Sequence, residues 1–252
     1  MFIDYGPLST KWYLQTKPPG YEIDGDITYY ASRLQGVKGK VLEAGVGSGR
    51  MLIPLLQRGL DVEGVDASPH MLAACRRALN DASLHARLVE GDVTTLTMNE
   101  MYEAIIMPTG SFGLIASFKE AEIVLRHFYD HLMPGGRVII DIEIMHDWKE
   151  GDITFHTLPF SDTEGMTLEI RNVRKDAVHQ TTETYLTYEY WVNGCRTESE
   201  LQRFMMRYYG IEELRLLLAT VGFEHITCSS EYEWGKCPTS ETTLVTFEAM
   251  KR

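Results

Sequence analysis

The stretch that most constrains the fold of this chain covers residues 40–68 and reads KVLEAGVGSGRMLIPLLQRGLDVEGVDAS. It begins as an apolar strand, turns at Gly45, Gly47 and Gly49, continues with a helical pattern, and ends as a second short strand at Asp66. Glycine lets a backbone turn sharply and leaves no Cβ between the backbone and a ligand. The pattern therefore predicts two parallel strands joined through a helix, with a ligand-binding loop where the first strand ends.

The loop also indicates the chemistry of its ligand. The free N–H groups at the start of the following helix favour an anionic group. Asp66 ends the next strand about 20 residues further on, where a carboxylate accepts hydrogen bonds from ribose hydroxyls. A dinucleotide fingerprint would need a glycine at the position of Arg50, and no Gly-Lys-Ser/Thr sequence follows as in a P-loop. The sequence therefore predicts a ligand with a ribose and a negatively charged group.

Strand and helix patterns alternate through the rest of the first half of the chain. Further strands are expected in ARLVEGD, YEAIIMP and RVIIDIEI. Helices are expected over residues 50–58, 68–81 and 118–132, and the sequence MPGG is expected to stop the last of them. Ser68 is a good N-cap for the second helix, and Pro69 suits its first turn. Such alternation predicts a parallel sheet with helices on both faces.

The pattern changes after residue 144, where the helical period gives way to the strand period. In TYLTYEYWVNGCRTES apolar and polar residues alternate, and Asn193-Gly194 is a strong two-residue hairpin turn. MTLEIRNVRKD is expected to form another strand. Residues 210–223 then have the pattern of an amphipathic helix, and EHITCSSEYEW and TTLVTFEAMKR are expected to pair as a terminal hairpin.

These patterns divide the chain into parts. Residues 1–38 are predicted to form an N-terminal helical cap, in which KPPG separates two short segments and the second is helical from about residue 26 to residue 34. Residues 39–252 are predicted to form one domain. An antiparallel β insertion over residues 142–208 interrupts this domain.

Several segments, in this order, resemble the motifs of the class I S-adenosylmethionine-dependent methyltransferases. VLEAGVGSGR resembles their first motif and VEGVDAS their second, in which Asp66 matches the acid that binds the ribose. LVEGDVTTL resembles the segment whose acid, here Asp92, contacts the adenine amino group. YEAIIMPTGSFGLI and LMPGGRVIID resemble the fourth and fifth strands, and the terminal helix and hairpin fit the antiparallel strand with which that fold ends. The resemblance therefore covers residues 39–141 and 210–252. It implies a Rossmann-like, doubly wound, mostly parallel α/β sheet with an antiparallel C-terminal strand.

The resemblance implies S-adenosyl-L-methionine as the cofactor, held by the glycine loop and by the turns after the next strands. The expected cofactor-binding residues are Glu43, Gly45, Gly47, Gly49, Arg50, Asp66, Ala67, Met71, Gly91, Asp92, Val93 and Thr109. For Glu43, a buried acid bonded to the loop backbone is an equally good interpretation, and Arg50 equally suits a solvated helix position. Asp66 is alternatively a helix N-cap, although Ser68 can fill that role, and Asp92 is alternatively a turn acid.

The insertion is rich in aromatic residues, namely Tyr185, Tyr188, Tyr190, Trp191, Phe204 and Tyr208. An antiparallel sheet at this place resembles the substrate-covering insertion of small-molecule methyltransferases, including the sugar-amine N-methyltransferases and glycine N-methyltransferase. The alternative is a second hydrophobic layer without a role in substrate binding. Catalytic residues stay unassigned, and the substrate-side candidates follow the fifth strand: Glu143 and His146 as bases and Trp148 as a wall of the acceptor site.

Other features favour structural roles. His127 and His131 are four apart on a predicted helix, but Phe128 stands where a zinc-protease motif needs glutamate, so no metal site is expected. The four cysteines form no Cys-x-x-Cys pair, which indicates reduced thiols. The loop MPTGSFG lacks the [DN]-P-P-[YF] tetrad of the resembling nucleic-acid and protein-glutamine methyltransferases, which disfavours those substrates.

The composition narrows the partners. A net charge of −12 and a pI near 5.1 disfavour nucleic acid. No apolar run approaches the roughly 20 residues that cross a bilayer, and the N-terminus MFIDYGPLSTKW lacks the features of a signal peptide, so no membrane partner and a cytoplasmic location are expected.

The leading hypothesis is in-line transfer of a methyl group from S-adenosylmethionine to a nitrogen or oxygen atom of a small-molecule acceptor. The protein is expected to be a monomer or a homodimer. Two alternatives stay open: a nicotinamide-dependent oxidoreductase, and a regulatory protein that binds S-adenosylmethionine without turnover.

Overall fold

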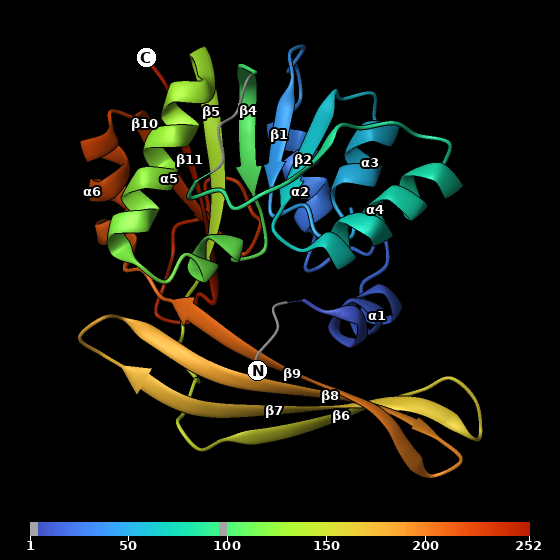
Figure 1. The fold of residues 1–252 in the computed structure, drawn as a ribbon. Coiled ribbons are helices and arrows are strands. Elements are labelled where there is room, and N and C mark those ends of the chain that lie inside the picture. The colour runs from blue at the N-terminus through green and yellow to red at the C-terminus, as the bar shows by residue number, and fades with distance from the viewer. Residues whose placement is uncertain (1–4, 96–99) are drawn as a thin grey trace.

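The structure, a computed structural model, describes residues 5–95 and 100–252 and contains two β-sheets (Figure 1). The larger sheet has seven strands in the order β10-β11-β5-β4-β1-β2-β3. Its strands are β1 (Val41–Ala44), β2 (Val62–Asp66), β3 (Leu88–Glu90), β4 (Tyr102–Met107), β5 (Leu132–Glu143), β10 (Glu224–Ser230) and β11 (Leu244–Met250). Strands β1 to β5 are parallel to one another, whereas β11 is antiparallel to β5 and β10 is antiparallel to β11. The predicted mostly parallel sheet with an antiparallel C-terminal strand is confirmed.

Helices cover both faces of the larger sheet, as predicted. They are α2 (Asp26–Arg33), α3 (Leu52–Gln57), α4 (Pro69–Asp81), α5 (Phe118–His131) and α6 (Ile211–Val221). The side chains of β4 alternate between two hydrophobic clusters. Ile105 and Met107 join the cluster that contains residues of α5 and α6, whereas Ala104 and Ile106 join the cluster that contains residues of α2, α3 and α4. The strand period of two therefore places one core on each face of the sheet.

Some helix ends follow the capping residues of the sequence. Ser68 caps α4 by accepting a hydrogen bond from the Met71 N–H at 3.2 Å. Helix α6 ends at Gly222, whose φ of 117° is one that glycine adopts readily. Helix α3 is shorter than predicted, because residues 50 and 51 still belong to the turn that leaves the glycine loop. No helix in the described part of the chain is long and apolar enough to cross a membrane.

The segment after β5 forms the second sheet, with its strands in the order β6-β7-β8-β9. They are β6 (Ile153–Pro159), β7 (Glu164–Asp176), β8 (Thr181–Val192) and β9 (Cys195–Arg207), and all neighbouring pairs are antiparallel. The predicted hairpin turn joins β8 to β9, with φ values of 49° at Asn193 and 76° at Gly194. The sequence pattern did not reveal β6, because this edge strand is exposed along most of its length and lacks a buried face.

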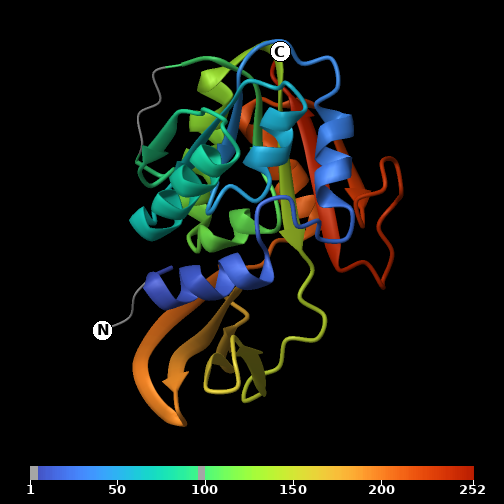
Figure 2. The same cartoon turned by 90° about the vertical axis from the view of Figure 1, so that its right-hand side faces the viewer.

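Helix α1 (Pro7–Thr16) lies between the larger sheet and the small sheet (Figures 1 and 2). Leu8 and Trp12 pack against apolar residues of the small sheet, among them Tyr188 and Tyr190. The carboxyl ends of the parallel strands point toward α1 and the small sheet (Figure 1). The loops that follow these strands therefore face the helix and the small sheet, and this is the edge where open α/β sheets bind their ligands.

Candidate functional site

The glycine loop after β1 has the backbone conformation that its sequence predicts. Gly45, Gly47 and Gly49 have φ values of 76°, 54° and 84°, which side chains rarely tolerate. A Cβ at Gly49 would lie 2.8 Å from the Sγ atom of Cys75 on α4, so this glycine allows the loop to pack on the helix. A Cβ at Gly47 would meet no atom within 4 Å. Gly47 therefore presents its backbone to open space, as a loop that receives a ligand must.

Asp66 connects this loop to the end of β2. Its Oδ2 accepts a hydrogen bond from the Gly47 N–H at 2.8 Å, and its Oδ1 accepts one from the Ser68 N–H at 2.8 Å. Burial raises the pKa of Asp66, and these two backbone bonds oppose the rise. Since each carboxylate oxygen has two acceptor positions, the fixed carboxylate keeps positions for a further pair of hydroxyl donors.

The turn after β3 lies beside Asp66. The Gly91 N–H donates to the Asp66 carbonyl at 3.0 Å. Asp92 is exposed and accepts a hydrogen bond from the Thr94 N–H at 2.8 Å, as a turn acid does, while Val93 packs partly buried against the core. On the other side of Asp66, Ala67 is exposed, and Met71 is buried in the first turn of α4. The structure thus gathers the predicted residues of β1, β2 and β3 at one edge of the sheet.

Glu43 is buried at the end of β1, with 2% of its surface exposed. Its Oε2 atom has no hydrogen-bond partner within the described residues, and no bond from its carboxyl group to the loop backbone is found there. Burial raises the pKa of Glu43 to about 8, although the nearby Arg50 lowers it. A buried polar atom without a partner is costly, so this carboxyl group is a candidate for contact with a ligand.

Arg50 is buried rather than solvated, which makes the solvated-helix interpretation wrong. Its Nη2 lies 2.5 Å from Asp26 Oδ2 at the start of α2, and its Nη1 donates to the Tyr21 carbonyl at 2.8 Å. The Arg50 carbonyl in turn accepts the Gly20 N–H at 2.9 Å. Arg50 therefore attaches the N-terminal segment to the glycine loop. The Tyr13 side chain of α1 also contacts Arg50, which lowers the Tyr13 pKa less than burial raises it.

The turn after β4 also contacts the glycine loop. Thr109 has a φ of 53°, and its N–H donates to Asp141 Oδ2 at 2.7 Å. Asp141 is fully buried in β5 and also accepts hydrogen bonds from Tyr232 and Thr246 at 2.8 and 2.6 Å. Burial nevertheless raises its pKa to about 6. The Ser111 Cβ lies 3.5 Å from the position that a Cβ at Gly45 would occupy, so Asp141 holds a turn that contacts the loop.

The three substrate-side candidates have different surroundings. Glu143, the last residue of β5, lies against the same turn, with its Cγ 3.0 Å from the position of a Cβ at Gly110. His146 forms a hydrogen bond through Nε2 with the Thr242 carbonyl at 2.9 Å. The Trp148 Nε1–H donates to Thr184 Oγ1 in the small sheet at 3.2 Å. The structure therefore brings Glu143 to the candidate site, whereas His146 Nε2 and Trp148 Nε1 are bonded elsewhere.

Lys17 and Asp141 were not among the predicted site residues. Lys17 follows the last residue of α1, and its Nζ lies 5.6 Å from the centroid of the Tyr13 ring. Two signals were present: a lysine directly before a rigid Pro-Pro pair, and an acid inside the apolar run of β5. Neither signal shows by itself which distant part of the chain contacts Lys17 or Asp141 in the fold.

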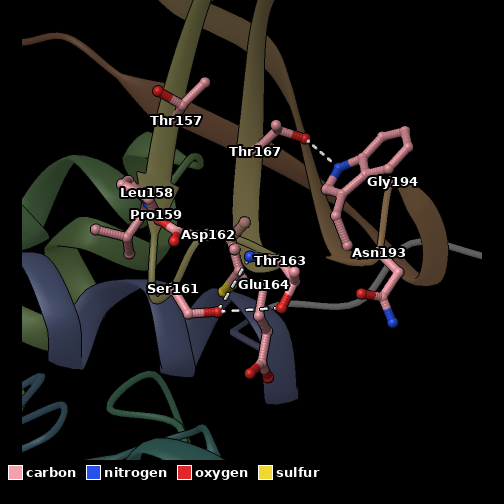
Figure 3. A pocket seen from close by; sticks show the side chains of 13 residues that line it. Thr157, Leu158, Pro159, Ser161, Asp162, Thr163, Glu164, Thr167, Asn193 and Gly194 are labelled. Atoms are coloured by element: carbon pink, nitrogen blue, oxygen red, sulfur yellow. Dashed lines mark hydrogen bonds between the residues drawn. The ribbon is translucent and has the colours of Figure 1, made fainter.

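A separate hollow of about 510 Å³ lies at one end of the small sheet (Figure 3). Its wall includes Trp191, whose Nε1–H donates to Thr167 Oγ1 at 2.9 Å, and the turn that contains Asn193 (Figure 3). Of the predicted site residues that the structure describes, none lines this hollow. It is therefore distinct from the site at the glycine loop.

Comparisons with known proteins agree with this geometry. A family profile described as "Methyltransferase domain" matches residues 41–136. The chain is 28% identical over 101 residues to a dTDP-3-amino-3,4,6-trideoxy-alpha-D-glucopyranose N,N-dimethyltransferase of Streptomyces venezuelae, a match that covers 40% of this chain and 41% of that protein. It is 26% identical over 214 residues to a glycine/sarcosine N-methyltransferase of Parasynechococcus marenigrum (strain WH8102), which covers 84% of this chain and 72% of that protein. The chain thus aligns with less than half of the first of these relatives.

Among solved structures, an amino pentose methyltransferase from Micromonospora echinaspora with bound S-adenosylmethionine has the same fold, with a TM-score of 0.72. At 17% identity it covers all of this chain and 99% of that one. The fold and the glycine loop are those of the class I S-adenosylmethionine-dependent methyltransferases. Residues 41–136 match the methyltransferase-domain family. The resemblance inferred from the motifs is confirmed.

Proposed function

We propose that the protein transfers a methyl group from S-adenosyl-L-methionine to a nitrogen atom of a small-molecule acceptor. The observation that carries the proposal is the bond between Asp66 and the Gly47 N–H, which joins an open glycine backbone to a carboxylate. The names of the relatives, a sugar N,N-dimethyltransferase and a glycine/sarcosine N-methyltransferase, favour an amine acceptor. An oxygen acceptor is the alternative.

The residues present fit the cofactor. Gly47 leaves room beside the backbone, and Glu43 has a buried oxygen atom without a partner in the described chain. The glycine loop and Glu43 would hold the methionine end, Asp66 the ribose, and Asp92 the adenine. The flanking positions would be Gly45, Gly49, Arg50, Ala67, Met71, Gly91, Val93 and Thr109. Arg50 is already paired with Asp26, so its role would be to shape the loop.

The mechanism needs little from the protein beyond positioning. When bound, S-adenosylmethionine supplies a sulfonium-activated methyl group, whose carbon bonds to the acceptor nitrogen as its bond to sulfur breaks and leaves the electron pair on sulfur. Helix α1 and the small sheet would exclude water from this edge of the large sheet (Figure 2). Burial raises the pKa of Glu143, so its carboxylate is suited to take a proton from an acceptor ammonium.

The roles of the outer segments belong to the same proposal. Residues 1–38 would act as the helical cap, and the insertion within residues 142–208 would cover the acceptor. His146 and Trp148 would then support the segment between β5 and β6 rather than contact the acceptor. The cytoplasmic location and the monomeric or homodimeric state stay predictions, and light scattering would determine the latter.

Calorimetric titration with S-adenosylmethionine and with S-adenosylhomocysteine tests the cofactor site. Asp66→Asn keeps the shape of the side chain but removes its charge, and should weaken binding roughly tenfold or more, as expected for a lost charge-assisted hydrogen bond. Asp61→Ala, which changes an exposed acid just before β2, is the matched control. Unchanged affinity in Asp66→Asn would contradict the ribose assignment.

Two further measurements separate the alternatives. A nicotinamide-dependent oxidoreductase would change NADH fluorescence on mixing, and we expect no change. A regulatory protein without turnover would bind S-adenosylmethionine but form no S-adenosylhomocysteine with any metabolite pool. Formation of S-adenosylhomocysteine that depends on an added amine would establish the transferase.

A further inference from the structure

Lys17 and Glu143 are two oppositely charged residues without an ion-pair partner among the described residues, although the Lys17 Nζ atom lies 5.6 Å from the centroid of the Tyr13 ring. Within the described residues, neither the Lys17 Nζ nor the Glu143 carboxylate forms a hydrogen bond or an ion pair, and none joins the two to each other. Both side chains are exposed. Most charged side chains with these properties are simply solvated. The surroundings of Lys17 and Glu143 therefore decide whether the two residues belong to a binding site.

Lys17 is held in place by the segment that follows it. Its N–H donates to the Tyr13 carbonyl at 2.7 Å, which ends α1, and two prolines then restrict the backbone. Directly after the prolines, the Gly20 N–H donates to the Arg50 carbonyl at 2.9 Å, and Arg50 donates to the Tyr21 carbonyl. Lys17 therefore lies a fixed short distance along the chain from a segment bonded to the glycine loop.

Glu143 approaches the same loop from β5. Its Cγ and Oε1 atoms both lie 3.0 Å from the position of a Cβ at Gly110, so the side chain packs closely against this glycine. The next residue, Ser111, lies against Gly45 of the glycine loop. Glu143 is thus placed at the carboxyl ends of β4 and β5, one turn away from the cofactor loop.

The two charges also share an environment that is only partly water. Surrounding protein is the largest cause that lowers the pKa of Lys17 and that raises the pKa of Glu143, while their mutual attraction opposes both shifts. Both groups are thus partly desolvated by the segments around them, although neither is enclosed. A ligand with complementary charges would offset this desolvation, because it would supply the partners that both groups lack.

We propose that Lys17 and Glu143 together recognise the methyl acceptor, and that the acceptor is therefore an amine that also carries an anionic group. Glu143, beside the turn that contacts the cofactor loop, binds the ammonium form of the amine. Lys17 binds the anionic group. The anion is a carboxylate, as in an amino acid, or a phosphate, as in a nucleotide-linked amino sugar. This inference rests on the proposed methyl transfer.

Binding to the protein saturated with S-adenosylhomocysteine tests the pairing without turnover. The probes come in matched pairs: glycine with glycinamide, and a deoxythymidine-diphosphate amino sugar with the free amino sugar. We expect one anionic member to bind at least tenfold more tightly than its neutral partner. Preference for glycine identifies a carboxylate acceptor, and preference for the nucleotide-linked sugar identifies a phosphate acceptor. Equal binding of the charged and neutral members overturns the inference.

Variants then assign the two residues. Lys17→Met should raise the Kd of the preferred anionic amine tenfold or more, and Lys17→Arg should restore most of the affinity. Glu143→Gln should weaken binding of the amine and lower kcat with S-adenosylmethionine. Lys11→Met is the matched control, because Lys11 lies on the helix that precedes Lys17, and its Nζ lies 3.8 Å from the centroid of the Tyr190 ring instead.

The cofactor affinity distinguishes the failure of this inference from the failure of the proposed function. We expect the Kd of S-adenosylhomocysteine to be unchanged in Lys17→Met and Glu143→Gln. If Lys17→Met weakens S-adenosylhomocysteine instead of the acceptor, Lys17 is a cofactor contact and the inference is wrong. If S-adenosylhomocysteine binds but no anionic amine does, the inference also fails while the cofactor site stands. Absence of S-adenosylhomocysteine binding to the unmodified protein would instead refute the proposed function itself.

Discussion

Arg50 and Asp26 form a buried ion pair, with 2.5 Å between the Arg50 Nη2 and Asp26 Oδ2 atoms. The pair joins the turn after the glycine loop to the first residue of α2. Asp26 also accepts backbone hydrogen bonds from Ile23 and Ile27 at 2.9 and 2.7 Å, so its charge organises the start of the helix. The N-terminal segment and the cofactor loop are consequently one structural unit, although the two residues are 24 positions apart.

Breaking this pair should destabilise the fold. In Asp26→Asn the Arg50 guanidinium stays buried without a countercharge, which typically costs about 3–5 kcal/mol of unfolding free energy. Urea unfolding would measure the loss, and the double variant Asp26→Leu/Arg50→Met should recover part of it. Arg58→Met is the control, since this exposed side chain donates to the Pro54 carbonyl and has no ion pair within the described residues. Stability of Asp26→Asn equal to that of the control would show that the pair is not desolvated.

Two glycines of the loop should respond differently to alanine. Gly49→Ala places a Cβ 2.8 Å from the Cys75 Sγ at a φ of 84°, so crowding and backbone strain should lower the unfolding free energy by roughly 1–3 kcal/mol. Cys75→Ala in the same chain should recover the crowding part only. Gly47→Ala meets open space, so only the strain of its φ of 54° should lower stability, and it should weaken S-adenosylmethionine binding more than it lowers stability. Thermal unfolding with and without the cofactor separates the effects, and an equal loss of stability at both positions would contradict them.

The buried Glu43 should make stability depend on pH. Burial raises its pKa from an ordinary 4.5 to about 8, so folding favours the protonated carboxyl group. Its contribution to stability is therefore fully present below pH 4.5 and is lost as the pH rises toward 8. Glu43→Gln should remove this dependence and gain on the order of a few kcal/mol relative to the unmodified protein at pH 8.5.

Urea unfolding of the cofactor-free protein at pH 5 and at pH 8.5 would test this difference. Glu212→Gln, on the exposed side of α6, is the control and should follow the unmodified protein. Parallel pH profiles for Glu43→Gln and the unmodified protein would mean that Glu43 is ionised in the fold or that another group supplies its partner.

Features whose determining residues are close together in the sequence could be predicted from it. The glycine loop and Asp66 lie within one strand-helix-strand unit, and residues that are adjacent in the sequence determine the backbone conformation of that unit. The hairpin at Asn193-Gly194 is local for the same reason. These features and the order of the helices and strands of the large sheet could therefore be predicted.

Features that depend on distant partners could not be predicted. Arg50 was a candidate for either a solvated or a cofactor-facing position, because nothing near it in sequence reveals that Asp26 reaches it. The proposed role of Lys17 in acceptor binding depends on Glu143, a residue far away in the sequence that the fold places near it. Strand β6 was not predicted, because an exposed edge strand has no buried face that would require apolar and polar residues to alternate.

Glu200 should control the order of α1 over the acceptor side. This carboxylate of β9 accepts hydrogen bonds from the Leu8 and Ser9 N–H groups at 2.7 and 3.1 Å, and so caps a helix that lies 191 positions or more away in the sequence. Without it, two N–H groups of the first turn and the positive end of the helix dipole lose their partner, which costs about 1 kcal/mol or more of local stability. Glu200→Ala should therefore speed amide hydrogen exchange throughout α1.

The same change should raise the KM for the acceptor more than it changes the affinity for S-adenosylmethionine, because α1 places Lys17, whereas β2 also holds the glycine loop through the Val65 carbonyl. Glu198→Ala, an exposed acid two residues away on the same strand, is the matched control. Glu200→Gln keeps one acceptor oxygen and should fall between the two. If exchange in α1 stays as slow in Glu200→Ala as in the control, the packing of Leu8 and Trp12 on the small sheet alone orders the helix, and the cap is dispensable.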